Sequence, residues 1–305
     1  YENRDDVTLT TYVLADSKEM LNGKARPAVL ICPGGAYISC SDREAEPVAM
    51  AFAAMGYHAF VLRYSVYGEQ VFATGFDKME PKKECQFPMP MRVIGQAMMT
   101  IKENAQNWHV DPDRIAICGF SAGAHNCAMY SVYWDKPEIT DYFKKDKEVF
   151  RPAACILGYC LSDYLYMKEN NTDKAFFDGS NMGFLGTKDP SDELLAKVSP
   201  ALNVDANTPP TFLWATAEDN LVPVQHSIRM AHALADHHIP FEMHIFEEGP
   251  HGLAVSTQAS AASRSQIYPD AAKWVPLADA WLSKRFAFDL PDMTDFERMM
   301  AEKAL

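Results

Sequence analysis

No run of apolar residues in this sequence approaches the roughly 18 that a helix needs to cross a bilayer. Internal repeats and low-complexity tracts are also absent, which is typical of a globular chain. Lysine and arginine residues do not cluster in the sequence. There are 28 of them against 41 acidic residues, so the net charge is −13. This balance argues against nucleic acids and anionic membranes as partners, and it favours a neutral substrate over a polyanionic one.

Paired cysteine motifs are missing too. The chain has 7 cysteines, an odd number, and no C-x-x-C. Cys32, Cys118, Cys155 and Cys160 lie in apolar runs, where reduced cysteines usually pack. We therefore expect core packing instead of disulfides or metal binding, and a reducing, cytoplasmic compartment. The sequence begins at Tyr1 without a methionine, so a signal peptide removed earlier would leave no trace.

The sequence does contain a regular alternation of short apolar runs with helical patterns. The runs have little polar alternation, which is typical of parallel strands covered on both faces. They span 28–33, 58–64, 114–120, 153–160, 211–217 and 241–246. Helical spacing occupies 46–57, 91–108, 122–134 and 224–238, and the alternating stretch 7–14 predicts an antiparallel edge strand. The order predicts a single α/β domain over 1–305 with a mostly parallel, doubly wound sheet.

Two long segments interrupt this alternation, at 65–90 and 162–190. Both are rich in aromatic residues and carry proline or glycine. Both also follow the carboxyl ends of predicted strands, where open α/β sheets place their sites. Long loops in compact domains often serve as lids. We therefore expect a lid insertion at 65–90, and we treat the residues after 288 as a C-terminal tail.

Ser121 stands at a junction in the stretch ICGFSAGAHNCAMY. The residues before it predict a buried strand, and those after it predict a helix with small residues at its start. Gly119 and Gly123 flank the serine in a G-x-S-x-G pattern. One interpretation is a tight turn with a helix-capping serine. The other is a nucleophile held above the sheet edge, and the strand and helix on either side favour it.

A serine nucleophile needs a base and a carboxylate that orients the base. Of nine histidines, eight lie within or at the ends of predicted strands and helices, where surface or core roles are expected. His251 instead sits in the loop EEGPHGL past the last predicted strand. Asp219 follows the run 211–217 by a short turn, and Glu218 and Asp163 are the alternative acids. The alternative interpretations are structural: Asp219 would form a turn, and His251 would be a solvated loop residue. The chain order serine, aspartate, histidine favours the catalytic one.

The stretch CPGGAY, residues 32–37, follows the first predicted core strand. Its backbone N–H groups can approach a substrate closely, as donors to a developing oxyanion must. An ordinary Pro-Gly turn is the alternative.

These motifs resemble those of a known family. PGGAY resembles the HGGG-type oxyanion motif, with Pro33 where the histidine usually stands, and GFSAGA resembles the nucleophile elbow, with Ala124 where a further glycine is common. Together with the stretches 43–66, 110–123, 199–223 and 244–255, they make the chain similar to bacterial α/β-hydrolases of the acetyl-xylan-esterase-like or xylanase-B-associated type. These are near the feruloyl-esterase and hormone-sensitive-lipase branches. The resemblance covers most of 25–287 and leaves out 67–90 and the tail.

The resemblance implies a Ser-His-Asp acyl-enzyme cycle. In it Ser121 is the nucleophile, His251 the base and later the acid, and Asp219 the orienting carboxylate. No cofactor and no metal is implied.

The resemblance also implies the surroundings of the reaction. Gly35, Ala36 and Ala122 would donate backbone N–H groups to the oxyanion, and Tyr37 would form a substrate-binding pocket wall. The expected function is hydrolysis of short acyl esters, above all acetyl, on small molecules or on oligosaccharides derived from plant glycans. The alternatives are a broad-specificity carboxylesterase or lipase, a feruloyl esterase, and a non-catalytic binding protein with a hydrolase fold. Formation of a homo-oligomer stays open.

Overall fold

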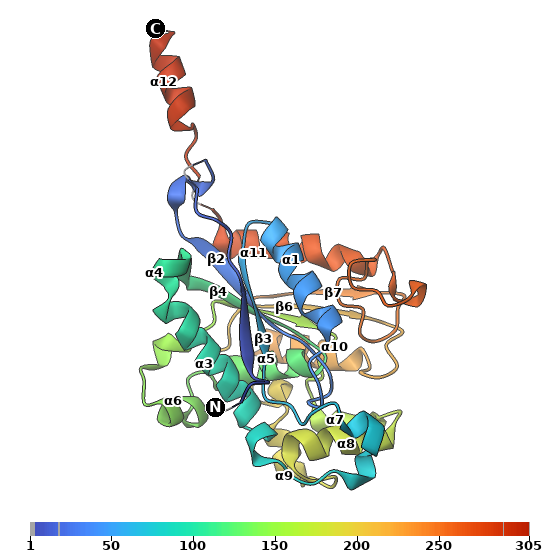
Figure 1. Ribbon diagram of the computed structural model, residues 1–305. Coiled ribbons are helices and arrows are strands. Elements are labelled where there is room, and N and C mark those ends of the chain that lie inside the picture. Colours follow the sequence, from blue (N-terminus) through green and yellow to red (C-terminus); the bar gives the residue numbers. More distant parts are fainter. Residues whose placement is uncertain (1–3, 18, 289, 305) are drawn as a thin grey trace.

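One mixed sheet forms the centre of the molecule in the computed structural model, which describes residues 4–17, 19–288 and 290–304 (Figure 1). The strands are β1 (Thr8–Tyr12), β2 (Arg26–Cys32), β3 (His58–Arg63), β4 (Val110–Phe120), β5 (Ala154–Gly158), β6 (Thr211–Thr216) and β7 (Phe241–Phe246). They lie in the order β1-β3-β2-β4-β5-β6-β7. All neighbours are parallel except β1, which pairs antiparallel with β3. The predicted sheet and its antiparallel edge strand are thereby confirmed.

The central strands are apolar where helices cover both faces of the sheet, as in 28–32 of β2 and 115–120 of β4. Leu30 and Ile117 pack in one core with α3 (Met89–Glu103), α5 (Ala122–Tyr133) and α10 (Gln225–Asp236). Their neighbours Val29 and Cys118 point the opposite way, into a second core with α1 (Glu46–Ala54) and α11 (Trp274–Phe286). Alternate residues of one strand thus serve two cores, which leaves no place for polar alternation.

The predicted helices are present with small changes at their ends. The stretch 91–108 is two helices, α3 and the short α4 (Ala105–Trp108), with Asn104 between them. The Asn104 side chain donates to the carbonyl of Thr100, 2.8 Å away, at the end of α3. The helix α1 ends ahead of Gly56, whose φ of 97° suits glycine. The helix α11 and α6 (Pro137–Phe143) are additional to the predicted set.

The segment 162–190, expected as a long loop, is largely helical together with the residues that follow it. It contains α7 (Tyr164–Asn170) and α8 (Lys174–Leu185), and α9 (Asp192–Lys197) comes next. Each helix begins after a residue whose side chain accepts a hydrogen bond from the first turn: Asp163, Asp173 and Ser191. These helices gather at one end of the molecule, at the lower edge of Figure 1.

The segment 65–90 packs against α8. It contains the short helix α2 (Val71–Thr74) and several turns. The ring of Phe76 meets that of Phe176 edge to face, with 6.0 Å between the ring centroids. The backbone N–H of Phe87 donates to the carbonyl of Phe184 at 2.8 Å. The two segments that interrupt the alternation therefore form one joint structure.

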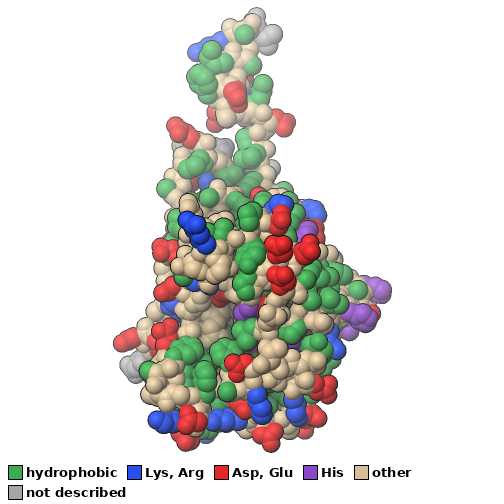
Figure 2. Space-filling view, turned by 90° about the vertical axis from the view of Figure 1, so that its right-hand side faces the viewer, with side chains coloured by type: hydrophobic (Ala, Val, Ile, Leu, Met, Phe, Trp, Pro, Cys, Tyr) green, Lys and Arg blue, Asp and Glu red, His purple; other side chains and the backbone are tan. Residues whose placement is uncertain are grey.

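The chain ends in α12 (Asp295–Lys303), which begins with a capping box and projects from the body (Figure 1). Figure 2 shows hydrophobic side chains on this projecting part. The exposed ones are Leu290, Met293, Phe296, Met299 and Met300. Within the described ranges, no helix combines the length and the apolar character that a membrane crossing requires.

All seven cysteines are free and buried, which confirms the expectation of core packing. The reducing, cytoplasmic location of the protein stays a prediction. On the face shown in Figure 2, lysine and arginine side chains are scattered among acidic ones.

Candidate active site

Ser121 occupies a strained turn between β4 and α5. Its φ of 52° and ψ of −122° lie in a region that costs a residue with a side chain about 1–3 kcal/mol. The flanking glycines make the turn possible. A Cβ on Gly119 would lie 2.3 Å from the carbonyl oxygen of Gly123, and a Cβ on Gly123 would lie 2.1 Å from that of Cys32. The G-x-S-x-G spacing is therefore a packing requirement, and it lifts the serine hydroxyl above the edge of the sheet.

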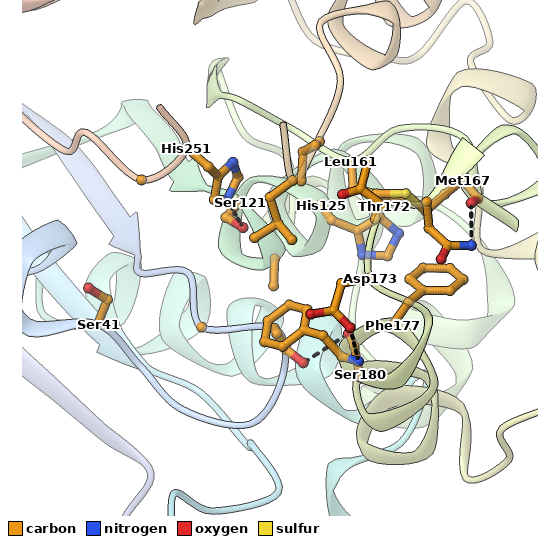
Figure 3. Close-up of a pocket in the computed structure, with 18 of the residues that line it drawn as sticks. Ser41, Ser121, His125, Leu161, Met167, Thr172, Asp173, Phe177, Ser180 and His251 are labelled. Carbon is orange, nitrogen blue, oxygen red and sulfur yellow. Dashed lines mark hydrogen bonds between the residues drawn. The ribbon is translucent and has the colours of Figure 1, made fainter. Parts of the chain in front are cut away.

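His251 connects Ser121 to Asp219. Its Nε2 lies 2.8 Å from Oγ of Ser121, and its Nδ1 lies 2.7 Å from Oδ2 of Asp219 (Figure 3 shows the first of these contacts). The three residues follow β4, β7 and β6, so three separate strand ends bring them together. The side chain of Asp219 is 1% exposed and that of His251 15%.

The hydrogen bonds determine which ring nitrogen of His251 holds the proton. A carboxylate can only accept a hydrogen bond, so Nδ1 of His251 carries the proton and donates to Asp219. Nε2 is then free to accept from the hydroxyl of Ser121. The second oxygen of Asp219 accepts the backbone N–H groups of Leu221 and Val222, at 3.0 and 2.9 Å. This arrangement can take a proton from the serine hydroxyl and hold the charge that forms on the imidazole.

The two alternative acids have other partners. Glu218 accepts the backbone N–H of Gly249 at 3.1 Å. Asp163 caps α7 and forms an ion pair with Arg229, 3.1 Å apart. Of the three candidates that the sequence offers, Asp219 is the carboxylate in contact with His251.

The loop after β2 presents backbone donors to the pocket. Gly35 and Ala36 have positive φ angles of 132° and 55°. Among the described residues, neither of their N–H groups has a backbone or side-chain acceptor, and Ala122 opens α5, where helix N–H groups lack intrahelical partners. All three residues line the same pocket as Ser121. Their position suits a group that carries developing negative charge.

Pro33 stands where the resembling family has a histidine, and other side chains hold the loop here. The hydroxyl of Tyr64 donates to the carbonyl of Pro33 at 2.8 Å. The buried carboxylate of Glu44 accepts the N–H of Gly34 at 2.7 Å. Neither residue was among the candidates from the sequence.

Tyr37 differs from its expected place. It is 1% exposed and lies behind the pocket, with its ring stacked on Phe184 and its hydroxyl 2.5 Å from Nδ1 of His125. His125, expected in a surface or core role, lines the pocket and donates through Nε2 to the carbonyl of Val198 at 2.8 Å. Burial lowers the pKa of His125 to about 4, so the imidazole is neutral. The pocket wall that Tyr37 was expected to form is supplied by His125.

The pocket has a volume of about 230 Å³. Figure 3 shows Met167 and Phe177 at the far side from Ser121 and His251, with Asp173 and Ser180 nearer the middle. Its apolar lining comes mainly from the residues after β5, from α7 and α8, and from the loop that carries Asp219. The apolar residues are Leu161, Tyr164, Met167, Phe176, Phe177, Leu221 and Val222. None of the described residues of 65–90 lines it. The segment expected as a lid thus supports α8 from behind, and α7 and α8 form the wall.

Comparisons with known proteins agree on one family. The family model described as BD-FAE matches residues 18–234. Endo-1,4-beta-xylanase B of Butyrivibrio fibrisolvens is 33% identical over 236 residues, which make up 76% of this chain and 33% of that protein. The chain spans about a third to a half of the length of the curated relatives it matches.

Two solved structures extend the similarity over nearly the whole chain. An α/β-hydrolase enzyme from a Medee basin deep-sea metagenome library is 34% identical, with a TM-score of 0.69 over 95% of this chain and 96% of that one. An acetyl ester-xyloside bifunctional hydrolase from Caldicellulosiruptor lactoaceticus is 28% identical, with a TM-score of 0.70 over 93% and 94%. The sheet described above is that of the α/β-hydrolase fold.

Proposed function

The chain belongs to the BD-FAE family of α/β-hydrolase esterases, and from this premise we propose that it is a serine esterase that removes short acyl groups, above all acetyl, from oligosaccharides of plant-glycan origin. The observation that carries the proposal is the hydrogen-bonded line from Ser121 through His251 to Asp219, which shares one small pocket with Gly35 and Ala36, whose N–H groups have no acceptor among the described residues.

The first half of the reaction transfers the acyl group to Ser121. Its Oγ attacks the ester carbonyl carbon while its proton moves to Nε2 of His251. The electron pair of the carbonyl bond moves to oxygen, and the N–H groups of Gly35, Ala36 and Ala122 stabilise this oxyanion. Each such donor is typically worth about 3 kcal/mol. The bond to the leaving oxygen then breaks, and His251 returns the proton to it, so that the alcohol departs first.

The second half releases the acid. A water molecule gives a proton to Nε2 of His251 and attacks the acyl carbon, and the same donors hold the second oxyanion. Collapse breaks the bond to Oγ, which recovers the proton from His251. Throughout, Asp219 keeps Nδ1–H in place and stabilises the imidazolium. The cycle uses groups of this chain and water.

The size of the pocket supports a short acyl group. Its volume of about 230 Å³ is below the range of about 300–1,000 Å³ that is usual for drug-sized ligands. Met167 and Phe177 close its far side (Figure 3). The sugar part of the proposal draws on the relatives, one named as a xylanase and another as an acetyl ester-xyloside hydrolase. The net charge of −13 also favours a neutral glycan over a polyanion.

The proposal is tested with a panel of esters read for released acid. The panel holds acetylated xylo- and manno-oligosaccharides, a feruloylated arabino-oligosaccharide, and p-nitrophenyl acetate and palmitate. We expect acetate release from the acetylated oligosaccharides with a kcat/KM above that for the feruloyl ester, and no turnover of palmitate. Ferulate release as the dominant reaction would replace acetyl with hydroxycinnamoyl as the substrate class. A chain that hydrolyses none of the panel would support the non-catalytic alternative.

A further inference from the structure

We propose that Glu44 is a positioning residue that ties the oxyanion loop to the loop of the catalytic base, so that one buried carboxylate sets the geometry of both. The inference rests on the proposed function, because it concerns how the Ser121 site reaches its reactive arrangement. Glu44 ends the 3₁₀ turn Asp42–Glu44 and is 4% exposed.

The first arm of the link runs from Glu44 to the oxyanion loop. Its Oε2 accepts the N–H of Gly34 at 2.7 Å. A Cβ on Gly34 would lie 2.7 Å from that oxygen and 2.8 Å from Cβ of Ser121, so only glycine allows the carboxylate and the loop to come this close. Gly34 directly precedes Gly35, whose N–H is a proposed oxyanion donor. Since two consecutive glycines have wide conformational freedom, a fixed peptide at Gly34 restricts the direction of the next N–H.

The second arm runs from Glu44 to the base. Its Oε1 accepts the hydroxyl of Tyr159 at 2.6 Å. The same hydroxyl oxygen accepts the backbone N–H of Ala254 at 3.0 Å, in the loop that carries His251. The ring of Tyr159 meets the imidazole of His251 edge to face, with 4.9 Å between the centroids. Tyr159 thus touches both the ring of the base and the backbone of its loop.

The chemistry of these contacts favours a carboxylate at this place. A buried carboxylate is costly unless its oxygens are hydrogen-bonded, and here each oxygen receives one strong donor. Burial and the neighbouring carboxylate raise the pKa of Tyr159 well above its usual range, which keeps its hydroxyl a donor. Tyr159 also holds a φ of 38°, an uncommon value for a residue with a side chain. Backbone strain of this kind persists where surrounding contacts enforce it.

The link makes a specific kinetic prediction. Loss of Glu44 frees the Gly34 peptide and the Tyr159 hydroxyl, so the N–H donors and the imidazole no longer meet the transition state in one fixed arrangement. Glu44 borders the pocket on the side of Ser121, whereas the apolar wall proposed to hold the acyl group comes mainly from α7 and α8. We therefore expect kcat to fall while KM changes little. Glu44→Ala should lower kcat about a hundredfold, as does the loss of one oxyanion donor.

The test measures kcat and KM for p-nitrophenyl acetate in Glu44→Ala, Glu44→Gln and Tyr159→Phe, with Glu46→Gln as the matched control on an exposed glutamate. Active sites are counted with a fluorophosphonate, so that misfolded protein does not lower the apparent kcat. Glu44→Gln keeps one acceptor and should lie between wild type and Glu44→Ala. Tyr159→Phe should lower kcat about tenfold, and the Glu44→Ala/Tyr159→Phe double variant should lose less than the product of the two single effects.

A transition-state analogue separates positioning from general damage. The inhibition constant of a methyl trifluoromethyl ketone should rise by the same factor by which kcat falls, because both report the tetrahedral geometry. Wild-type protein without esterase activity would remove the proposed function itself. Active wild-type protein with Glu44→Ala within threefold of its kcat, or with a change confined to KM, would overturn the role of Glu44. Additive effects of Glu44→Ala and Tyr159→Phe would overturn the link between the two loops.

Discussion

The hydroxyl of Ser121 and Nε2 of His251 lie 2.8 Å apart although 130 positions of sequence separate them. The contact exists because β4 and β7 run parallel and end at the same edge of the sheet. A proton can pass between the two atoms without movement of the backbone. The predictions below follow from this contact and from the pocket beside it.

Asp219 should matter more to turnover than either neighbouring acid. Asp219→Asn should lower kcat by about a thousandfold or more, because the imidazole loses the partner that orients it and stabilises its charge. Asp163→Asn and Glu218→Gln are the matched controls, since their carboxylates bind Arg229 and the N–H of Gly249 instead. Each should retain most of the wild-type kcat for p-nitrophenyl acetate. An inactive Asp163→Asn variant beside an active Asp219→Asn variant would assign the role of the acid to Asp163, in the segment after β5.

Acyl-chain length should be limited by α7 and α8. We expect kcat/KM for p-nitrophenyl esters to fall steeply after butyrate and to vanish beyond about eight carbons, because a longer chain gains binding energy only if the pocket lengthens. Phe177→Ala should shift the profile towards hexanoate and octanoate. Phe72→Ala is the control, since Phe72 is 57% exposed and does not line the pocket. A flat profile in the wild-type protein would contradict a closed acyl pocket.

Replacement of 67–88 by a short linker tests the lid expectation separately. The segment supports α8 without lining the pocket, so its removal should relax the chain-length limit through a looser α8. The melting temperature should fall at the same time. An unchanged dependence of kcat/KM on acyl-chain length would mean that this segment has a structural role alone.

Stability should decline as the pH falls from about 6.5 towards 4. Burial lowers the pKa values of His58, His125 and His226 to about 4. In the unfolded chain these imidazoles titrate near 6.5, so between the two values the unfolded state binds protons that the folded state excludes. The contribution of the neutral histidines to the free energy of unfolding is complete above about pH 6.5 and is lost progressively down to about pH 4.

Thermal unfolding between pH 8 and pH 4 measures this loss. His58 accepts the N–H of Leu14 and donates to the carbonyl of His109, and a glutamine can make both contacts without titrating. The fall in melting temperature should therefore be smaller in His58→Gln than in wild type. Equal slopes in the two proteins would contradict a buried, neutral His58.

Much of the fold was predictable because its strands are covered on both faces. Leu30 and Val29 serve opposite cores, so the run around them is apolar at every position. The helices α7 and α8 were harder to recognise, because α7 is short and buries Tyr164 and Met167, while the buried face of α8 mixes Phe177 with polar residues such as Asn181. Pro276, inside the first turn of α11, obscured the pattern of that helix.

The candidate site shows the same division. Ser121, Asp219 and His251 each follow a strand, and strand ends can be read from hydrophobic runs. The prediction for Tyr37 was wrong because Ala36 and Tyr37 have φ angles of 55° and 61°. Positive φ angles are uncommon for residues other than glycine, so the sequence did not indicate that the ring turns inward. Glu44 sits in the charged stretch SDREAE, where its sequence neighbours give no sign that it is buried.

The central claim is that Ser121 carries the acyl group, and Ser121→Ala tests it most directly. The measurement is the turnover of p-nitrophenyl acetate by wild type and variant, with the melting temperature of both and the site of labelling by a fluorophosphonate. The account predicts a label on Ser121 alone in the wild-type protein, and loss of turnover and labelling in the variant at a nearly unchanged melting temperature. Turnover near the wild-type level in Ser121→Ala, or a label on another serine, would contradict it.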